Sequence, residues 1–225
     1  MNRQFWYNNS MEEKRKSIEA YTTVRKSAEC EFVEKKSRFI GICHPIENQE
    51  EAEEYLRACR ERFPDATHVV FAWQTVLPER GGRFSDDGEP QGTAGMPTLD
   101  VLRKRGVDQA IILVVRYFGG IQLGAGGLVR AYSKAASMAL DAAIPLEMVL
   151  RQRVRVIAPY EDFEKLRYQI AEAGFYQEEA EFGMDPEWVV SIQEEELPRL
   201  KELCAQFTAG AALLAREGID YAPKL

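Results

Sequence analysis

The sequence predicts an α+β protein made of two domains, and three observations support this. Its 225 residues exceed the usual size of a single domain. The charge changes near Pro145: residues 1–150 carry 20 basic and 21 acidic side chains, whereas residues 151–225 carry 9 and 15. The second segment has the predicted order strand, helix, strand, strand, helix, strand, which is typical of a ferredoxin-like domain. We therefore expect domains at residues 18–147 and 150–222.

The first domain follows a tail. Residues 1–17 differ in character from the rest of the chain, and we expect them to be mobile. A strand is expected near Tyr21, and the apolar run Phe39–Cys43 predicts a buried strand. A helix is predicted over residues 50–63, because apolar residues recur there at helical spacing. These residues are Ala52, Tyr55, Leu56, Cys59 and Phe63.

The following elements surround a long polar connection. Alternating side chains over Val69–Trp73 predict a strand. The polar, glycine-rich segment Glu79–Gly95 is expected to be a loop, and loops of this length usually have a function. A short helix is predicted over Pro97–Gly106, since proline is common at the start of helices and glycine at their ends. The β-branched run Ala110–Val115 predicts a central strand, and a helix is predicted over residues 128–142.

The second domain has shorter elements. Two helices are predicted to end at Gly174 and Gly210, where glycine can close a helix. We also expect a hinge between Ile144 and Gln152, because the residue pattern and the charge both change there. The strands are expected near residues 152–158, 176–182, 187–193 and 211–217.

Composition narrows the class of protein. Hydrophobic residues make up 45% of the chain and charged residues 29%, which is ordinary for a globular protein. No apolar run is long enough to cross a membrane, and the first residues lack the apolar core of a signal peptide. The four cysteines form no Cys-x-x-Cys pair. We therefore expect free thiols and a cytoplasmic location.

A local basic zone interrupts an acidic background. The net charge of −7 argues against a non-specific coat for nucleic acid. Residues 101–134 nevertheless hold six basic residues against one acidic residue, Asp108. A basic zone of this kind indicates an anionic partner better than the total charge does.

Within this zone a glycine-rich segment joins a predicted strand to a predicted helix. Glycine lets several backbone N–H groups point into one small volume, and a helix start adds partial positive charge. The segment is therefore a candidate site for an anion or nucleic acid, although it matches neither the Walker nor the dinucleotide spacing. The alternative is a tight, closely packed turn. The candidate residues are Arg116, Tyr117, Gly119, Gly120, Gly124, Gly126, Gly127, Arg130 and Lys134, together with Lys36 and Arg38 from the basic stretch beside the first buried strand.

An acidic loop is the second candidate. Asp86, Asp87 and Glu89 could hold Mg²⁺ or act as acid and base, and we add Thr93 and His68 as possible pocket residues. The alternative is a polar turn in which these side chains cap backbone N–H groups. A further possibility is that the acids meet the basic residues of the glycine-rich segment. On that view we expect both loops on the same side of the domain.

Three stretches together resemble the YigZ/IMPACT family. They are Lys36-Ser37-Arg38-Phe39, the run from Asp86-Asp87-Gly88-Glu89-Pro90 to Pro97, and the run from Arg116-Tyr117-Phe118-Gly119-Gly120 to Arg130-Ala131-Tyr132. The match covers about residues 20–145. The C-terminal part is similar to the ferredoxin-like domain that follows in bacterial members, which resembles a domain of elongation factor G.

The resemblance implies a fold and a class of function. The first domain would be an α/β sandwich like the second domain of ribosomal protein S-five. Eukaryotic IMPACT regulates translation through protein partners, so the implied partners are RNA, the ribosome or a translation-related protein. Some members have been labelled proline dipeptidases, but the sequence lacks a recognisable set of His and acidic metal ligands, which does not support that activity.

Three readings of the function remain open. We favour a non-enzymatic module that binds within the translation apparatus, with no catalytic residue, metal or cofactor and with a monomer as the favoured state. The second reading is an enzyme that acts on a phosphorylated small molecule, which needs the carboxylates in a pocket beside the glycine-rich loop. The third is a regulator that binds only proteins, which should expose a large apolar patch.

Overall fold

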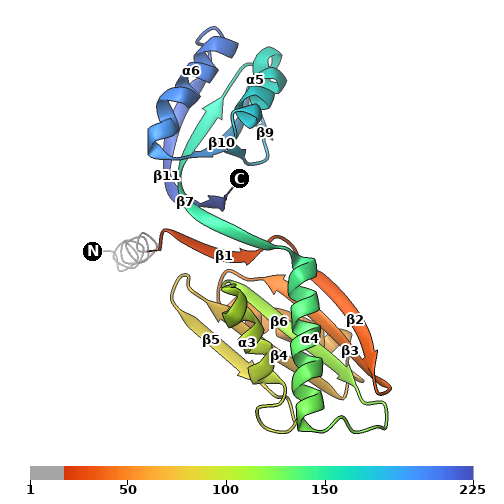
Figure 1. The fold of residues 1–225 in the computed structure, drawn as a ribbon. Coiled ribbons are helices and arrows are strands. Elements are labelled where there is room, and N and C mark those ends of the chain that lie inside the picture. Colours follow the sequence, from red (N-terminus) through yellow and green to blue (C-terminus); the bar gives the residue numbers. More distant parts are fainter. Residues whose placement is uncertain (1–17, 225) are drawn as a thin grey trace, which may run out of the picture. The chain divides into compact units, whose positions relative to one another are not determined.

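The computed structural model describes residues 18–224 (Figure 1). The expected mobile tail at residues 1–17 lies outside these residues. The described chain divides into two compact units, one ending at Glu147 and the other beginning at Met148. None of the helices within residues 18–224 is long and apolar enough to cross a membrane.

The N-terminal unit is built on a five-stranded sheet in which every neighbouring pair is antiparallel. Its central strand, β6, carries the β-branched run that predicted a buried strand. In spatial order the strands are β2 (Ala28–Glu34), β3 (Ser37–Pro45), β6 (Ala110–Tyr117), β4 (His68–Thr75) and β5 (Gly81–Ser85). A further strand, β1 (Ala20–Val24), precedes them and is not part of this five-stranded sheet; its Thr22 carbonyl accepts a hydrogen bond from the Asp108 N–H.

Helices cover both faces of this sheet. On one face α2 (Gln49–Arg62) packs over side chains such as Phe71 and Leu113. On the other face α3 (Gly95–Arg105) and α4 (Ala125–Ala143) pack together over alternate positions of the same strands. The two helices on this face are both visible in front of the sheet in Figure 1. Because strand side chains alternate between faces, each strand supplies both cores.

The C-terminal unit confirms the ferredoxin-like prediction. Its strands are β7 (Pro145–Ile157), β8 (Tyr176–Gln177), β9 (Glu181–Phe182), β10 (Pro186–Ile192) and β11 (Leu213–Pro223). β7 pairs with both β11 and β10, and β10 pairs with β8 and β9, always antiparallel. A core on one face of the sheet joins it to α5 (Tyr160–Glu172) and α6 (Leu197–Phe207), which follows a short 3₁₀ turn, η1 (Glu194–Glu196).

One local expectation was wrong, and one strand was missed. The predicted loop Glu79–Gly95 contains β5, whose Gly-Gly start gives no alternating apolar pattern. β2 was not predicted, because its outward positions are acidic and it lies at a sheet edge. In both cases pairing with the strand adjacent in the sequence forms a strand where the local pattern is weak. The boundary between the two compact units, Glu147 and Met148, falls within the segment Ile144–Gln152 where a hinge was expected. Most of this segment belongs to β7, and flexibility there stays a prediction.

The approach of α4 to the sheet is closest at Gly41 of β3. A Cβ added at Gly41 would lie 2.4 Å from the Ala135 carbonyl oxygen of α4. That oxygen is backbone and cannot rotate away. The contact requires glycine, and alanine at position 135 keeps the facing surface of α4 equally thin.

We predict that Gly41→Ala lowers the free energy of unfolding by about 1–3 kcal/mol, because the added methyl group forces α4 away from β3. Urea unfolding followed by circular dichroism measures this change. Gly126→Ala in α4 is the control: its Cβ would meet only the Arg130 guanidinium at 3.7 Å. The control should be neutral or slightly stabilising. Equal stability of Gly41→Ala and the parent would contradict the close packing.

Candidate functional site

A buried polar network lies on the α4 face of the sheet. The register places Phe39 of β3 and His68 of β4 directly opposite Arg116 of β6. All three residues therefore point to the face that α4 covers. A charged side chain in the middle of this row is unusual, because the preceding residues of β6, Ala110–Val115, are apolar and buried.

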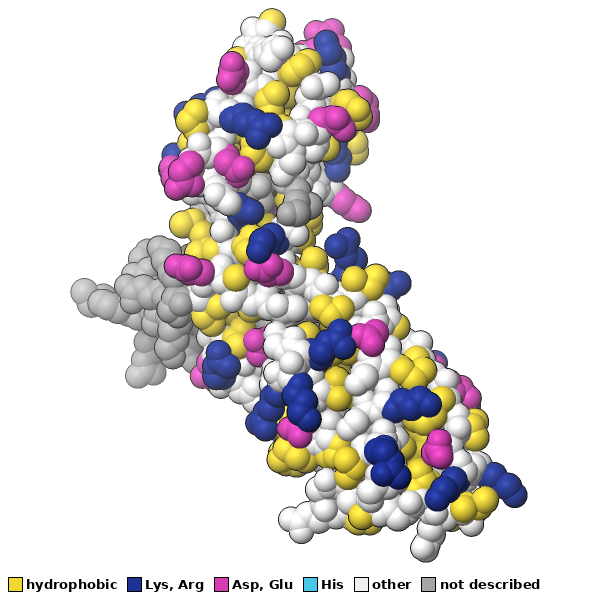
Figure 2. Space-filling model, in the orientation of Figure 1, with side chains coloured by type: hydrophobic (Ala, Val, Ile, Leu, Met, Phe, Trp, Pro, Cys, Tyr) yellow, Lys and Arg dark blue, Asp and Glu magenta, His cyan; other side chains and the backbone are white. Residues whose placement is uncertain are grey.

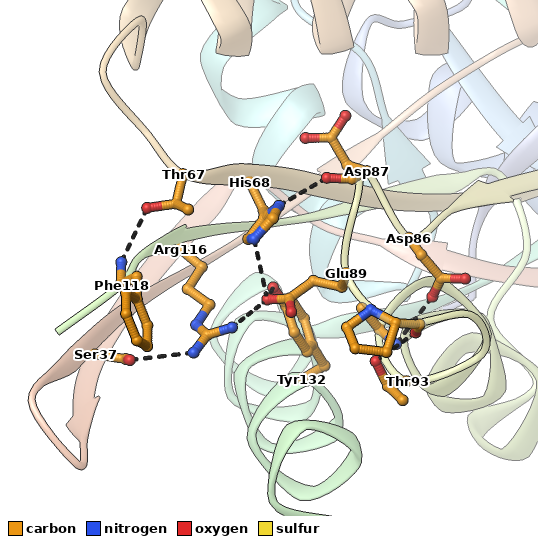
Figure 3. A network of polar contacts seen from close by, with 12 residues as sticks. Ser37, Thr67, His68, Asp86, Asp87, Glu89, Thr93, Arg116, Phe118 and Tyr132 are labelled. Carbon is orange, nitrogen blue, oxygen red and sulfur yellow. Dashed lines mark hydrogen bonds and ion pairs between the residues drawn. The ribbon is translucent and has the colours of Figure 1, made fainter. Parts of the chain in front are cut away.

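Glu89 supplies the opposite charge from the acidic loop. Its Oε1 accepts hydrogen bonds from Arg116 Nη1 and from the Tyr132 hydroxyl of α4, the latter at 2.7 Å (Figure 3). The exposed fractions of the Arg116 and Glu89 side chains are 5% and 3%. Removing one member of such a buried pair leaves an uncompensated charge, which typically costs about 3–5 kcal/mol.

Arg116 makes further contacts that hold its guanidinium in place. Nη2 donates to the Ser37 hydroxyl at 3.3 Å, and the same hydroxyl accepts the Gly119 N–H at 3.2 Å. The guanidinium also lies 5.4 Å from the ring centres of both Phe39 and Phe118. Its buried Nε has no hydrogen-bond partner among the described residues. Arg116 thus joins β3, β6 and the start of the glycine-rich loop.

His68 and Tyr132 complete the network. His68 Nδ1 lies 2.7 Å from the Asp87 carbonyl, which can only accept, so Nδ1 carries a proton. Nε2 of the same ring lies 3.7 Å from Glu89 Oε1. Burial and the hydrogen bond to Glu89 raise the pKa of the Tyr132 phenol. Tyr132 is therefore held as a neutral hydrogen-bond donor.

The other acids of the loop act as hydrogen-bond acceptors for backbone. Asp86 accepts the N–H groups of Gly92, Ala94 and Gly95 at 2.8–3.0 Å, and so caps the start of α3. Burial raises the pKa of Asp86, but these backbone hydrogen bonds outweigh it and the net shift is downward. Thr93 likewise donates to the Pro90 carbonyl at 2.6 Å. These contacts match the alternative interpretation of the loop as a capped polar turn.

The position of Asp87 contradicts the expectation that the acidic loop and the glycine-rich loop lie on the same side of the domain. Its carboxylate accepts the Val69 N–H at 2.6 Å and pairs with Arg60 of α2 at 3.2 Å. It therefore lies toward the α2 face, whereas Arg130 belongs to α4 on the opposite face. Figure 3 shows the Asp87 side chain directed away from Tyr132. The loop lies at the start of β4 and the end of β6, and only Glu89 of its acids reaches the glycine-rich segment.

The glycine-rich segment forms a hollow at the start of α4. Gly124 is the N-terminal cap, with φ 72°, and no side chain caps the first N–H groups of the helix. The hollow has a volume of about 300 Å³. Its lining consists of Glu89, Pro90, Arg116, Phe118, Gln122, Leu123, Gly124, Ala125 and Leu128. Gly119 has a packing role instead, because a Cβ there would lie 2.0 Å from the Lys36 carbonyl group.

A second, basic hollow of about 220 Å³ shares Leu123 in its lining with the first. Arg130 and Lys134 of α4 and Lys35 of the β2–β3 turn line it, with Glu34 as its one carboxylate. The Lys134 ammonium lies 4.3 Å from the centre of the Phe32 ring. Figure 2 shows Lys and Arg side chains spread over the face of the N-terminal unit that carries α3 and α4. We refer to Lys35, Arg130 and Lys134 as the α4 cation cluster.

Two of the predicted site residues lie elsewhere. Arg38 pairs with Glu31 at 2.7 Å and stacks over Tyr117, whose hydroxyl donates to Asp65. Both side chains point to the α2 face, because Arg38 and Tyr117 are paired and alternate with Arg116 along the sheet. They are therefore separated from the α4 cation cluster by the sheet. Arg116 is also withdrawn from direct binding by its pairing with Glu89.

The sequence interpretation missed Tyr132 and Ser37 as members of the network. Tyr132 is fully buried among alanines of α4. A tyrosine on an otherwise small, apolar helix face needs a partner for its hydroxyl, and that need was the available signal. No group of three or more His, Cys, Asp or Glu side chains within residues 18–224 is arranged to hold a metal ion.

Comparisons with known proteins agree on one family. Residues 35–140 match the family model of the Impact N-terminal domain. IMPACT family member YvyE of Bacillus subtilis is 33% identical over 92% of this chain and 95% of its own length. IMPACT family member YigZ of Escherichia coli is 45% identical, over 47% of this chain and 53% of its own length. A solved structure described as a hypothetical protein has a TM-score of 0.57 and 28% identity, covering 88% of this chain and 97% of that one.

We predict that Tyr132→Phe lowers the free energy of unfolding by about 1.5–3 kcal/mol, because Glu89 loses a hydrogen bond to a charged acceptor in a buried site. Urea unfolding at neutral pH measures the loss. Tyr168→Phe is the control, since Tyr168 is 60% exposed and should not change stability. A loss as small as that of the control would show that the Tyr132 hydroxyl contributes nothing.

The same variant should change the pH dependence of stability. The folded pKa of Tyr132 is raised above an unfolded value of about 10. Its contribution is therefore fully present below pH of about 10 and is lost as the pH rises above that value. The free energy of unfolding of Tyr132→Phe should fall less steeply with pH in this range than that of the parent. Parallel profiles for the two proteins would contradict this assignment.

Proposed function

Because the chain belongs to the IMPACT family, we propose that it is a non-enzymatic, translation-associated regulator that binds RNA, free or within the ribosome, through the α4 cation cluster. The family resemblance supplies the link to translation. The site supplies the mode of binding, which uses phosphate contacts from exposed cations at an uncapped helix start. Contacts of this kind position a protein on RNA without reading sequence.

The proposal depends chiefly on one observation, that the Arg130 side chain is exposed and unpaired among the described residues. It is exposed, and it makes no hydrogen bond or ion pair with the described residues. Its guanidinium lies beside Gly126, in the first turn of α4, where the helix end already carries partial positive charge. A cation at this end of a helix is electrostatically unfavourable. A bound phosphate would relieve both positive charges at once.

The neighbouring groups extend the same surface. Lys134 follows Arg130 one turn later on α4, and Lys35 faces them from the β2–β3 turn across a hollow of about 220 Å³. Leu123 lines both this hollow and the one at Gly124. A single strand could therefore pass from one hollow to the next, with a phosphate at each and a base against the exposed Phe118 ring.

The state of the acidic loop argues against the enzyme reading. Asp86 and Asp87 are occupied by backbone N–H groups and by Arg60. Glu89 does reach the hollow at Gly124, but its Oε1 is shared by Arg116 and Tyr132. Two of the three carboxylates proposed as metal ligands are thus directed elsewhere.

The hollow at Gly124 favours a second candidate function, the binding of a phosphorylated small molecule. Its volume of about 300 Å³ and its free helix N–H groups suit the phosphate of a small molecule. Such a ligand would use the start of α4 and would not need Lys134. Competition by a mononucleotide against labelled RNA separates the two functions. The mononucleotide should displace RNA at low concentration only if the hollow at Gly124 is a site for a small phosphorylated molecule.

We predict that Arg130→Ala weakens binding of labelled single-stranded RNA about ten- to a hundredfold at low salt, since one charge-assisted phosphate contact is lost. Fluorescence anisotropy over a salt series measures the affinity. Loss of one phosphate contact should also reduce the slope of log K against log salt by about 0.7. The thermal melt should be unchanged, because Arg130 is exposed.

Lys201→Ala provides the matched control, as it removes an exposed cation from α6 in the C-terminal unit. It should leave the affinity and the salt slope unchanged. If the parent protein binds no RNA at low salt, or if Arg130→Ala binds as the parent does, the RNA-binding function is rejected. The reading as a regulator that binds only proteins would then take its place.

A further inference from the structure

The edge strand β5 is an open surface on the N-terminal unit. It pairs with β4 along one side and ends the sheet on the other (Figure 1). Within the described residues, no backbone group of another element hydrogen-bonds to the outer side of Gly81–Ser85. Gly82, Arg83 and Phe84 are exposed. An edge of this kind presents unpaired N–H and C=O groups to which another extended chain can add.

A hollow of about 500 Å³ lies beside β5 on the α2 face. Arg83 points into this layer, because it is paired with Trp73, whose side chain packs with α2. Arg57 and Arg60 of α2 line the same hollow. Arg83 pairs with the exposed Glu53 at 3.3 Å, and Arg60 pairs with the half-buried Asp87 at 3.2 Å.

A second hollow, of about 450 Å³, lies beside the start of β5 on the α3 face. Arg80 precedes β5 and Arg103 comes from α3, and both line this hollow together with Leu99. Asp108 is the one carboxylate in its lining. Phe84, which is 38% exposed, lies on the same face because it is paired with Ala72.

The residues that line the two hollows make the surroundings of β5 strongly cationic. Together they are lined by five arginines and two carboxylates, a net charge of +3 in a chain whose total is −7. Exposed ion pairs such as Arg83 with Glu53 contribute little stability. A ligand carboxylate can therefore replace the carboxylate partner in such a pair, and a guanidinium binds a carboxylate in a bidentate manner.

We propose that β5 is a docking strand for an extended acidic peptide segment of a partner protein. The segment adds to the sheet edge through backbone hydrogen bonds. Its alternate side chains point to opposite faces, so every second residue faces Arg57, Arg60 and Arg83. The recognised pattern is therefore an acidic residue at every second position, separated by residues that favour an extended chain, such as valine.

The edge strand is what favours a peptide over nucleic acid. Arginines alone would bind phosphates as well as carboxylates. The unpaired backbone groups of β5, in contrast, match the alternating N–H and C=O groups of a polypeptide and have no counterpart in a sugar-phosphate chain. The surface is also formed by different residues from the α4 cation cluster, so it is independent of the proposed RNA binding.

The test uses the full chain and a fluorescently labelled peptide of alternating Glu and Val. A second peptide has the same composition with all Glu residues before all Val residues. A third is N-methylated at alternate residues on the edge that faces β5, which removes the donors needed for pairing. The proposal requires the alternating peptide to bind at least about tenfold more tightly than either of the others.

Charge-reversal variants then locate the site. Arg57→Glu and Arg83→Glu, which act from α2 and from β5, should each weaken binding of the alternating peptide by about tenfold or more. Lys201→Glu and Arg130→Ala should bind it as the parent does. Arg57→Glu keeps the test valid if the change in β5 disturbs folding, and a thermal melt of each variant checks this.

Three outcomes would overturn the proposal. Equal binding of the N-methylated peptide excludes backbone pairing with β5. If the peptide with separated Glu and Val blocks binds as tightly as the alternating peptide, binding depends only on non-specific charge attraction. Binding of labelled single-stranded RNA that is lost in Arg83→Glu but kept in Arg130→Ala would make this edge a nucleic-acid surface.

Discussion

The buried ion pair between Arg116 and Glu89 organises the candidate site. It attaches the loop after β5 to the central strand β6, and through Tyr132 it attaches the same loop to α4. Ser37 extends the connection to the β2–β3 hairpin and to Gly119. Segments far apart in the sequence are thus held by one carboxylate and one guanidinium. Since a lone buried charge is strongly unfavourable, these segments are expected to keep their arrangement together or lose it together.

Close packing by small residues allows this network to form. Gly41 and Ala135 bring α4 against β3, and Gly119 lies against the backbone of Lys36. The small residues place α4 near enough to the sheet for Tyr132 to reach Glu89. The glycines of the loop therefore have two roles. Gly119 serves packing, whereas Gly124 leaves the first N–H groups of α4 without a side-chain cap and accessible to a ligand.

The network and the two proposed surfaces divide the charged residues into separate roles. Arg116, Glu89 and the two aspartates of the loop stabilise the fold. Arg130, Lys134 and Lys35 line one hollow and are the residues proposed to bind an anion. The arginines around β5 form a third group at the sheet edge. A protein that binds RNA at one surface and an acidic peptide at another could link a ribosomal state to a protein partner.

The sequence by itself determined the α+β class, the ferredoxin-like order of the C-terminal unit, the family, and the position of α4 after a glycine-rich segment. These follow from local periodicity, from turn residues and from the residues that make up the sequence motifs. Tertiary structure alone decided which charged residues are free. Arg116 and Tyr117 are neighbours that point to opposite faces, and Asp87 and Glu89 separate around the sheet edge. The first outcome depends on the register that sets Arg116 opposite Phe39 and His68, which arises from pairing between strands distant in the sequence. The second depends on partners from α2 and α4 that only the folded chain brings to the loop.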